Sequence, residues 1–252
     1  MKLYTLGTGS CAISPTRHNV STLLEQGDNL YLFDAGSPAD ALMTRANKDI
    51  AKLRAVFVTH MHLDHVGALP NIVRAVSGLE KPEQPIFVFL PEARGYTSLN
   101  AWLEATHTRI DKKLFRFLET TKSPNLYEDE SITVGALPTD HIKGDMPISY
   151  AYTVDSKEGS VLLTGDLSCD LRDYPAMALE RDFDVCVCEA THYAPEDAVD
   201  LFSQSRFGQL ILTHIHTPWQ SKKAKASLRA LYHKLPFPVW IAEDGAEYTI
   251  RP

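Results

Sequence analysis

The sequence predicts an α/β protein in which two β-sheets pack face to face and helices cover their outer sides. Two observations support this prediction. Short apolar runs rich in β-branched and aromatic residues outnumber the segments with helical periodicity, and the helical segments fall between groups of these strand-like runs. Several of the runs also end in a histidine, an aspartate or a glutamate, which predicts a functional site at one edge of the sheets.

The chain of 252 residues is 44% hydrophobic and 23% charged, which is an ordinary globular composition. Because no repeat, low-complexity tract or linker divides it, we expect one domain over residues 1–252. No apolar stretch is long enough to span a bilayer, and the first residues lack the charged and apolar regions of a signal peptide. A cytoplasmic protein without a membrane partner is therefore expected.

The formal net charge is −7, from 25 basic and 32 acidic residues. Long nucleic acids bind mainly through neutralisation of many phosphates, so this balance argues against a broad nucleic-acid surface without excluding it. A small anionic substrate remains compatible, because a bound metal would reverse the local charge. The four cysteines form no CxxC pair and indicate no disulfide framework, in agreement with a reducing compartment.

The first half of the chain alternates strands and helices. Short apolar runs predict strands over residues 3–6, 21–25, 30–33, 55–58, 85–90 and 114–118. Turn-forming residues at 27–29 predict a hairpin between the second and third of these strands. Helical periodicity is present over residues 39–52, from about residue 65 onward, and over 92–106. Four side chains of the last helix are expected in the core, namely Tyr96, Leu99, Trp102 and Leu103.

The second half of the chain continues this pattern. Strands are expected over residues 132–134, 149–154, 161–164, 183–188, 210–213, 238–242 and 248–250, and helices over 195–205 and 221–234. Cys186 and Cys188 alternate within one apolar run, so we expect them to be small buried side chains on one face of a strand. The lysines of residues 222–225 are interpreted as a solvated helix face.

The most informative stretch runs from Thr59 to His65, directly after the apolar run 55–58. It places three histidines and one aspartate within residues 60–65. Residues two apart in an extended segment point the same way, so His60 and His62 can reach one ion. Asp64 and His65 follow where the chain turns, and they can face a second ion. Imidazole and carboxylate ligands without thiolate suit zinc, and also manganese or iron.

Later strands end in further candidate ligands. His141, Asp166, Glu189 and His214 each follow an apolar strand-like run. Asp166 also follows a glycine at a strand end, where a carboxylate is well placed to bridge two cations. Asp34 ends a strand too, and two interpretations of it stand. It is either a turn or helix cap, or a hydrogen-bond partner that fixes the ligand loops.

The stretch from His60 to His65 resembles the HxHxDH signature of the metallo-β-lactamase superfamily, and the later motifs follow in the superfamily's order. The resemblance implies a four-layer αββα sandwich, the metallo-β-lactamase fold, with two divalent metal ions as cofactors. Zinc is the expected ion, with manganese or iron as alternatives. The implied ligand sets are His60, His62 and His141 for one ion, Asp64, His65 and His214 for the other, and Asp166 as the bridge between them.

Within the superfamily the chain is most similar to the ribonuclease Z branch, through residues 6–10, 16–21, 32–36, 189–191 and 210–214. It departs from the precursor-processing enzymes in two ways. No long glycine- and proline-rich arm, which would grip transfer RNA, interrupts residues 106–126, and no His-Ser-Thr triplet follows Glu189. We therefore expect His192 or His216 to supply a proton, oriented by Glu189. An alternative is that Glu189 only accepts hydrogen bonds from backbone groups.

The resemblance implies a hydrolase in which metal-activated water attacks a phosphodiester. We expect a phosphodiesterase acting on a small or cyclic phosphodiester, with Asp64, Glu189, His192 and His216 as catalytic residues. The alternatives are a transfer-RNA 3′-end endonuclease, a thioester or lactone hydrolase, and a metal-binding protein without turnover. The expected partner is the small-molecule substrate. Nucleic acid is disfavoured as a partner, and a homodimer is left open.

Overall fold

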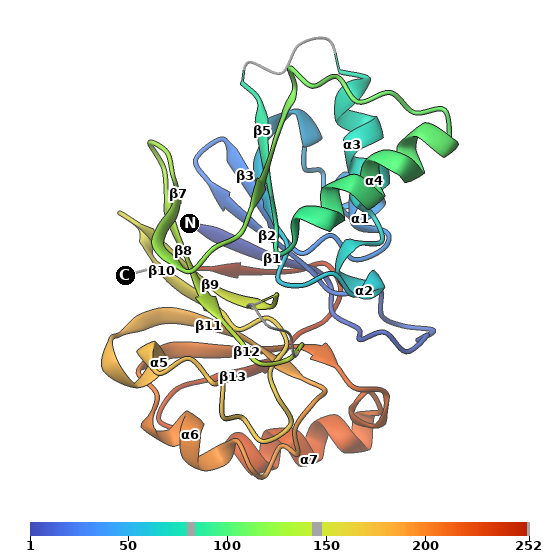
Figure 1. Cartoon of the computed structure of the whole chain (residues 1–252). Helices are drawn as coiled ribbons and strands as arrows, with labels where there is room; N and C mark the ends of the chain where they lie inside the picture. Colours follow the sequence, from blue (N-terminus) through green and yellow to red (C-terminus); the bar gives the residue numbers. More distant parts are fainter. Residues whose placement is uncertain (80–83, 143–147, 251–252) are drawn as a thin grey trace.

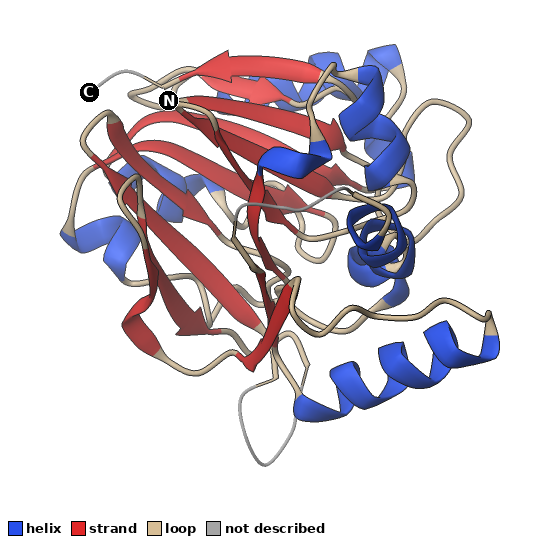
Figure 2. Cartoon of the chain, turned by 90° about the horizontal axis from the view of Figure 1, so that it is seen from above, coloured by secondary structure: helices blue, strands red, loops and turns tan. Residues whose placement is uncertain are grey.

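The two halves of the chain each supply most of one β-sheet. The structure, a computed structural model, describes residues 1–79, 84–142 and 148–250. In these residues two seven-stranded sheets pack face to face, and helices cover the outer side of each sheet (Figures 1 and 2). The predicted four-layer αββα sandwich is therefore confirmed.

The first sheet has the strand order β14-β1-β2-β3-β4-β5-β6. Its strands are β1 (Lys2–Gly7), β2 (Ser21–Gln26), β3 (Asn29–Phe33), β4 (Leu53–Phe57), β5 (Ile86–Leu90), β6 (Phe115–Glu119) and β14 (Ala246–Thr249). Its helices are α1 (Ala39–Arg45), α2 (Leu63–Val66), α3 (Leu69–Ser77) and α4 (Ala93–Ala105), with a 3₁₀ turn η1 (Ile50–Lys52) before β4. Strands β3 to β6 run parallel to one another.

The second sheet has the order β13-β12-β11-β10-β9-β8-β7. Its strands are β7 (Ser123–Glu128), β8 (Thr133–Pro138), β9 (Tyr150–Ser156), β10 (Gly159–Leu163), β11 (Phe183–Ala190), β12 (Phe207–Ile215) and β13 (Val239–Ile241). Its helices are α5 (Met177–Glu180), α6 (Val199–Gln204) and α7 (Lys222–Tyr232), with a 3₁₀ turn η2 (Thr217–Trp219) after β12. Strands β10 to β13 run parallel to one another.

The central strands are buried on both faces, which explains their continuous apolar sequences. In β4, Val56 packs under the outer helices, whereas Phe57 packs in the layer between the two sheets. Phe57 stacks there on Phe33 and Phe89, with ring centroids 4.9 and 5.1 Å away. Aromatic pairs at such distances stabilise a core beyond the area that they bury.

Two expectations about individual elements are corrected, and two elements were not predicted. Trp102 is 61% exposed rather than in the core, because it lies on the outer side of α4. The helix expected over 39–52 ends at Arg45, and the chain then passes through a positive φ of 56° at Asn47. Strand β7 and the short helix α5 were not expected. No helix in the described part of the chain combines the length and the apolar character needed to cross a membrane.

The topology brings the ends of several strands to one edge of the sandwich. Strand β4 of the first sheet ends there, as do β8, β10, β11 and β12 of the second. Hydrogen bonds to the carbonyls of Val58 and Thr59, directly after β4, join the sheets at this edge. The Tyr150 backbone N–H donates to the Thr59 carbonyl at 2.9 Å, and the Tyr152 hydroxyl donates to the Val58 carbonyl at 2.8 Å. The polar residues that follow these strands therefore face each other across the two sheets.

Candidate metal centre

The first sheet contributes the residues from His60 to His65. They follow β4 and continue into α2, and His60, Asp64 and His65 are buried, whereas His62 is exposed. Asp34, at the end of β3, fixes this loop. Its carboxylate accepts the Thr59 backbone N–H at 2.8 Å and the His65 Nδ1–H at 2.8 Å. Nε2 of His65 is thereby turned toward the other ligands, so Asp34 is a hydrogen-bond partner of the ligand loop.

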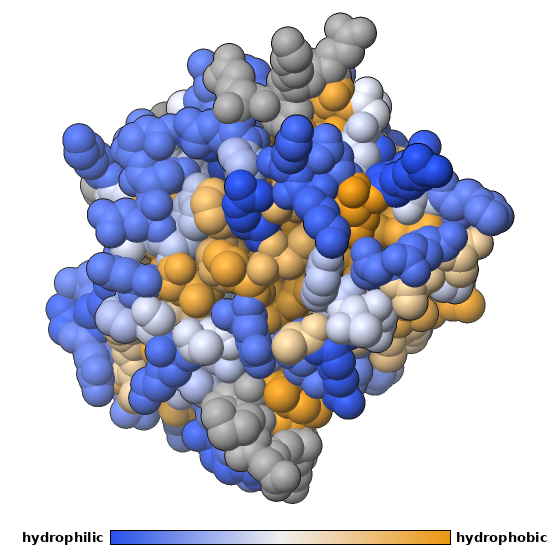
Figure 3. All heavy atoms as spheres, turned by 45° about the horizontal axis from the view of Figure 1, so that its top comes forward, coloured by the Kyte–Doolittle hydropathy of each residue, from blue (hydrophilic) through white to orange (hydrophobic). Residues whose placement is uncertain are grey.

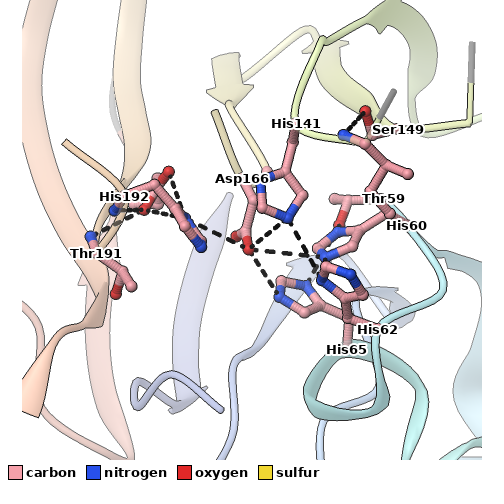
Figure 4. Close-up of polar contacts among 12 residues, drawn as sticks. Thr59, His60, His62, His65, His141, Ser149, Asp166, Thr191 and His192 are labelled. Carbon is pink, nitrogen blue, oxygen red and sulfur yellow. Dashed lines mark hydrogen bonds and ion pairs between the residues drawn. The ribbon is translucent and has the colours of Figure 1, made fainter. Parts of the chain in front are cut away.

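The second sheet contributes the other candidates. His141 follows β8, Asp166 follows β10, and His214 lies near the end of β12. Asp166 is 3% exposed and His214 is 2% exposed, so a carboxylate and an imidazole are buried side by side. In Figure 4, His60, His65 and His141 converge on Asp166, and His62 lies beside His60 and His141.

The structure assembles the candidate ligands into overlapping groups. Within each group, one ligand atom from every residue lies within 4.8 Å of the others. The groups include His60–His62–His141 and Asp64–His65–His214, together with two groups that share Asp166 (His60–His65–Asp166 and Asp166–Glu189–His192–His214). The first two groups have the same members as the two ligand sets that the resemblance implied.

Unpartnered nitrogens in this cluster fit a bound cation. Among the described residues, His65 Nε2 and His214 Nδ1 are buried without a hydrogen-bond partner, and Asp166 oxygens lie 3.4 and 3.6 Å from them. Nε2 of His60 and Nδ1 of His62 face each other at 2.9 Å. Buried polar atoms nearly always have partners, and one left unpaired costs about 1–3 kcal/mol. A divalent cation bound among these imidazole and carboxylate groups would satisfy them, so the donor set supports divalent metal binding.

The electrostatics of the cluster are those of closely coupled opposite charges. Burial alone would raise the pKa of Asp166, but the neighbouring His214 and His65 hold it well below its usual value. Burial would likewise lower the pKa of His214, yet the Asp166 carboxylate and the hydrogen bond to Asp64 raise it to about 10. Burial and the charge of His65 lower the pKa of His60. Protons therefore balance the buried carboxylates of the metal-free protein, and metal binding must displace them.

Glu189 and His192 form a dyad beside the cluster. The Glu189 carboxylate is 2% exposed and accepts the backbone N–H groups of Leu167, Thr191 and His192. It also accepts Nδ1–H of His192 at 2.9 Å. Both interpretations of Glu189 therefore describe it, because it accepts backbone donors and also orients a histidine. The His192 side chain is 30% exposed, and its Nδ1 lies 3.7 Å from Asp166 Oδ2.

His216 is the one sequence candidate that the structure does not bring into these groups. It lies at the start of η2, and its backbone N–H donates to the Ala190 carbonyl at 3.3 Å. Sequence reasoning also missed a residue that contacts two ligand loops, Asp173, which accepts the backbone N–H groups of Asp140 and Ser168. No motif or strand end marks Asp173, so the sequence carries no signal for it.

Two cavities bear on the position of the site, and the smaller one is lined by residues of both sheets. The small one, of about 30 Å³, is lined by candidate ligands such as His65, Asp166 and His214. A larger cavity of about 470 Å³ lies between α4 and β6, and no candidate ligand lines it. The space-filling view shows apolar side chains gathered in a hollow among hydrophilic ones (Figure 3). Because a reaction depends on the residues that line a cavity rather than on its size, we place the candidate site at the smaller cavity.

The fold and the cluster define a metallo-β-lactamase-fold protein, and solved structures of other proteins have the same fold. The structure is similar to human tRNase Z, short form, at a TM-score of 0.76 and 22% identity over 100% of both chains. It is similar to YhfI from Bacillus subtilis at a TM-score of 0.76 and 18% identity, over 98% of this chain and 99% of that one. A diphosphatase from the PhnP family has a TM-score of 0.71 and 19% identity, over 99% and 98% of the two chains.

Sequence comparison narrows this class. Ribonuclease Z of Methanocaldococcus jannaschii is 30% identical over 153 residues, 60% of this chain and 46% of the relative. Ribonuclease Z of Synechococcus sp. (strain CC9902) is 34% identical over 164 residues, 62% and 49% of the two chains. The chain thus spans about half the length of the curated relatives it matches. Residues 1–226 match the family model described as anti-Pycsar protein Apyc1, so the chain belongs to that family.

Proposed function

We propose that this chain is a metal-dependent phosphodiesterase that hydrolyses a small cyclic phosphodiester. The observation that carries the proposal is a pair of buried nitrogens, on His65 and His214, within a cluster of imidazoles and carboxylates. Neither nitrogen has a hydrogen-bond partner in the part of the chain that the structure describes. Ribonuclease Z relatives and a PhnP-family diphosphatase support phosphoester hydrolysis. The match to the anti-Pycsar family favours a cyclic nucleotide as the substrate.

Seven residues would hold the metal, and we propose two ions, with zinc as the preferred one. They are His60, His62, His141, Asp64, His65, His214 and the bridging Asp166. When bound, such ions neutralise charge on the phosphoryl oxygens and lower the pKa of water from 15.7 to about 7. The protein contributes a rigid frame for this chemistry, since Asp34 fixes one ligand loop and Glu189 fixes another.

We propose His192 as the proton donor to the leaving oxygen. Its ring is half-buried at the rim of the cluster, and the buried Glu189 carboxylate holds Nδ1–H at 2.9 Å. Burial would lower the pKa of His192, but the hydrogen bond and the charge of Glu189 raise it. The raised pKa favours the protonated ring, which is the form that a general acid needs. His216 is the weaker candidate, because it lies outside the groups that contain Asp166.

A small substrate agrees with the charge and the topology. The described residues between α4 and β8 hold only β6, β7 and their connections, without room for a long arm. The formal net charge of −7 also disfavours a long polyanion, whose affinity depends on many phosphate contacts. Transfer-RNA 3′-end processing is the second candidate, because the curated relatives are ribonuclease Z proteins.

The test compares three substrates at one salt concentration, with Zn²⁺ or Mn²⁺ added. They are a cyclic nucleotide, bis(p-nitrophenyl) phosphate and a precursor transfer RNA. We expect cleavage of both small phosphodiesters and a poor kcat/KM on the RNA, since this ratio measures discrimination in the transition state. A clear preference for the RNA would reverse the choice of substrate. No cleavage of any phosphodiester, with metal bound, would refute the proposal.

A further inference from the structure

Two loops that carry candidate ligands are tied to one carboxylate, that of Asp173. The loop after β8, which carries His141, donates the Asp140 backbone N–H to Asp173 Oδ2 at 2.7 Å. The loop after β10, which carries Asp166, donates the Ser168 backbone N–H to Oδ1 at 2.9 Å. The Ser168 hydroxyl donates to the same oxygen at 2.6 Å. Both oxygens of Asp173 therefore accept hydrogen bonds from these loops, and the Ser168 N–H also lies 3.1 Å from Oδ2.

We infer that Asp173 is a positioning residue, which sets the places of His141 and Asp166 relative to each other. The donors on Asp140 and Ser168 are one and two residues away from these side chains along the chain. A shift of either loop would therefore move a ligand. The inference rests on the proposed function, because it takes His141 and Asp166 as metal ligands.

The loop after β10 is held from both sides. The Leu167 backbone N–H donates to Glu189 at 2.8 Å, and the next N–H, that of Ser168, goes to Asp173. The Leu167 carbonyl faces Nδ1 of His141 at 3.4 Å. With two successive N–H groups bound to two carboxylates, the backbone after Asp166 has little freedom to turn. Partners of this kind commonly account for ten- to a hundredfold in metal affinity.

Asp173 is itself held in place by a tight turn. The backbone N–H of Leu171 donates to the Ser168 carbonyl at 3.0 Å, and that of Tyr174 donates to the Leu171 carbonyl at 3.0 Å. Leu171 adopts a φ of 56°, which is uncommon for a residue with a branched side chain. Leu171 and Tyr174 are both buried, which keeps this conformation. Backbone strain of this kind persists where the surrounding structure maintains it, often near functional sites.

Replacing Asp173 by asparagine changes the chemistry with little change in shape. Asparagine keeps one acceptor oxygen and turns the other into an NH₂ donor. In the place of Oδ2 that donor faces the Asp140 N–H, and in the place of Oδ1 it faces the Ser168 N–H at the shorter of its two contacts. Two donors repel each other, so the hydrogen bonding to one of the two loops is weakened. The matched control is Asp182→Asn, since Asp182 is exposed and pairs with Arg206 rather than with a ligand loop.

The experiment measures Zn²⁺ affinity by competition with a chromogenic chelator, for wild type, Asp173→Asn, Ser168→Ala and Asp182→Asn. We expect a ten- to hundredfold weaker affinity in Asp173→Asn, a smaller loss in Ser168→Ala, which keeps the backbone tie, and no change in the control. Hydrogen exchange of the metal-free protein should become faster at residues 139–142 and 166–170 in Asp173→Asn, but not at 59–65.

The two measurements separate this inference from the proposed function. Affinity within twofold of wild type and unchanged exchange in Asp173→Asn would overturn the positioning role, even with metal bound normally. If wild type takes up no metal, the proposed function is refuted, and the exchange measurement decides the positioning role by itself. If Asp173→Asn fails to fold, Ser168→Ala carries the test. Affinity in that variant equal to wild type would then overturn the inference.

Discussion

Replacing His192 by alanine tests the assignment of the proton donor, because its effect should depend on the leaving group. His192 is 30% exposed at the rim of the cluster and is held by Glu189 at 2.9 Å. A sugar alkoxide leaving from a cyclic nucleotide needs a proton, whereas p-nitrophenolate is stable enough to leave without one. The loss in His192→Ala should therefore be large for the first substrate and small for the second.

The magnitude follows from the role. A positioned general acid contributes roughly a hundred- to ten-thousandfold, which is about 3–5 kcal/mol of barrier. We expect a loss of that size in kcat/KM for the cyclic nucleotide, and less than about a tenth of it for bis(p-nitrophenyl) phosphate. The pKa of His192 is raised above 6.5 by its carboxylate partner, so the fall of kcat/KM on the alkaline side should lie above pH 6.5 and vanish in the variant.

Two further variants complete the assay. His233→Ala is the control, because His233 is exposed and, among the described residues, its ring hydrogen-bonds only to the Ala230 carbonyl. His216→Ala tests the competing donor and should keep most of the activity on both substrates. An equal loss on both substrates, accompanied by loss of metal, would refute the proton-donor role. It would show His192 to be a ligand in the group that it shares with Asp166 and His214.

Four further outcomes are expected. His60→Ala and Asp166→Asn should each abolish turnover while the circular dichroism of the fold persists, with metal analysis falling from about two ions per chain in wild type. Metal affinity should rise with pH, because the pKa of His214 is about 10 in the metal-free protein and its proton must leave; calorimetry in two buffers of different ionisation enthalpy would detect that proton. By the same shift, the stability that this proton gives the metal-free fold is present below about pH 6.5 and lost as the pH rises through about 10. Phe57→Ala should lower the free energy of unfolding by about 3–5 kcal/mol in chemical denaturation, since Phe57 is fully buried between two rings.

The central strands could be predicted because burial on both faces leaves a simple trace in the sequence. The run 55–58 is apolar throughout, and β4 carries it into both the outer and the inner core layers. Strand β7 leaves no such trace. It lies at an edge of the second sheet and contains Pro124 and two exposed polar residues, Asn125 and Glu128. Proline is tolerated at an edge because no neighbouring strand needs its N–H, so only the fold shows that this segment pairs.

Helical periodicity gave the location of α4 but not the extent of its buried face. Leu99 and Leu103 pack into the core, as their spacing predicts, whereas Trp102, which directly precedes Leu103, is exposed. Periodicity identifies an apolar stripe, and the packing partner decides how wide a stripe is covered. A large aromatic residue at the margin of the stripe can therefore fall on either side.

The candidate ligands could be predicted from the sequence. The residues that fix the ligand loops by hydrogen bonds could be predicted only in part. A ligand must be a histidine or carboxylate at a strand end, and these residue types stand out after apolar runs. Glu189 and Asp34 share that signal, since both follow strands. Asp173 does not, because its role depends on two loops that are adjacent only in the folded chain.

The site also depends on how the two sheets meet, since neither sheet contains a complete ligand set. His60 and His62 come from the first sheet, and their third partner, His141, comes from the second. The sheets are joined at this edge by the hydrogen bond from Tyr150 to Thr59, next to His60. Ligand distances are therefore set by the packing of the whole sandwich rather than by one loop. Because metal would bind only when both halves are in place, its binding free energy would stabilise the entire fold against unfolding.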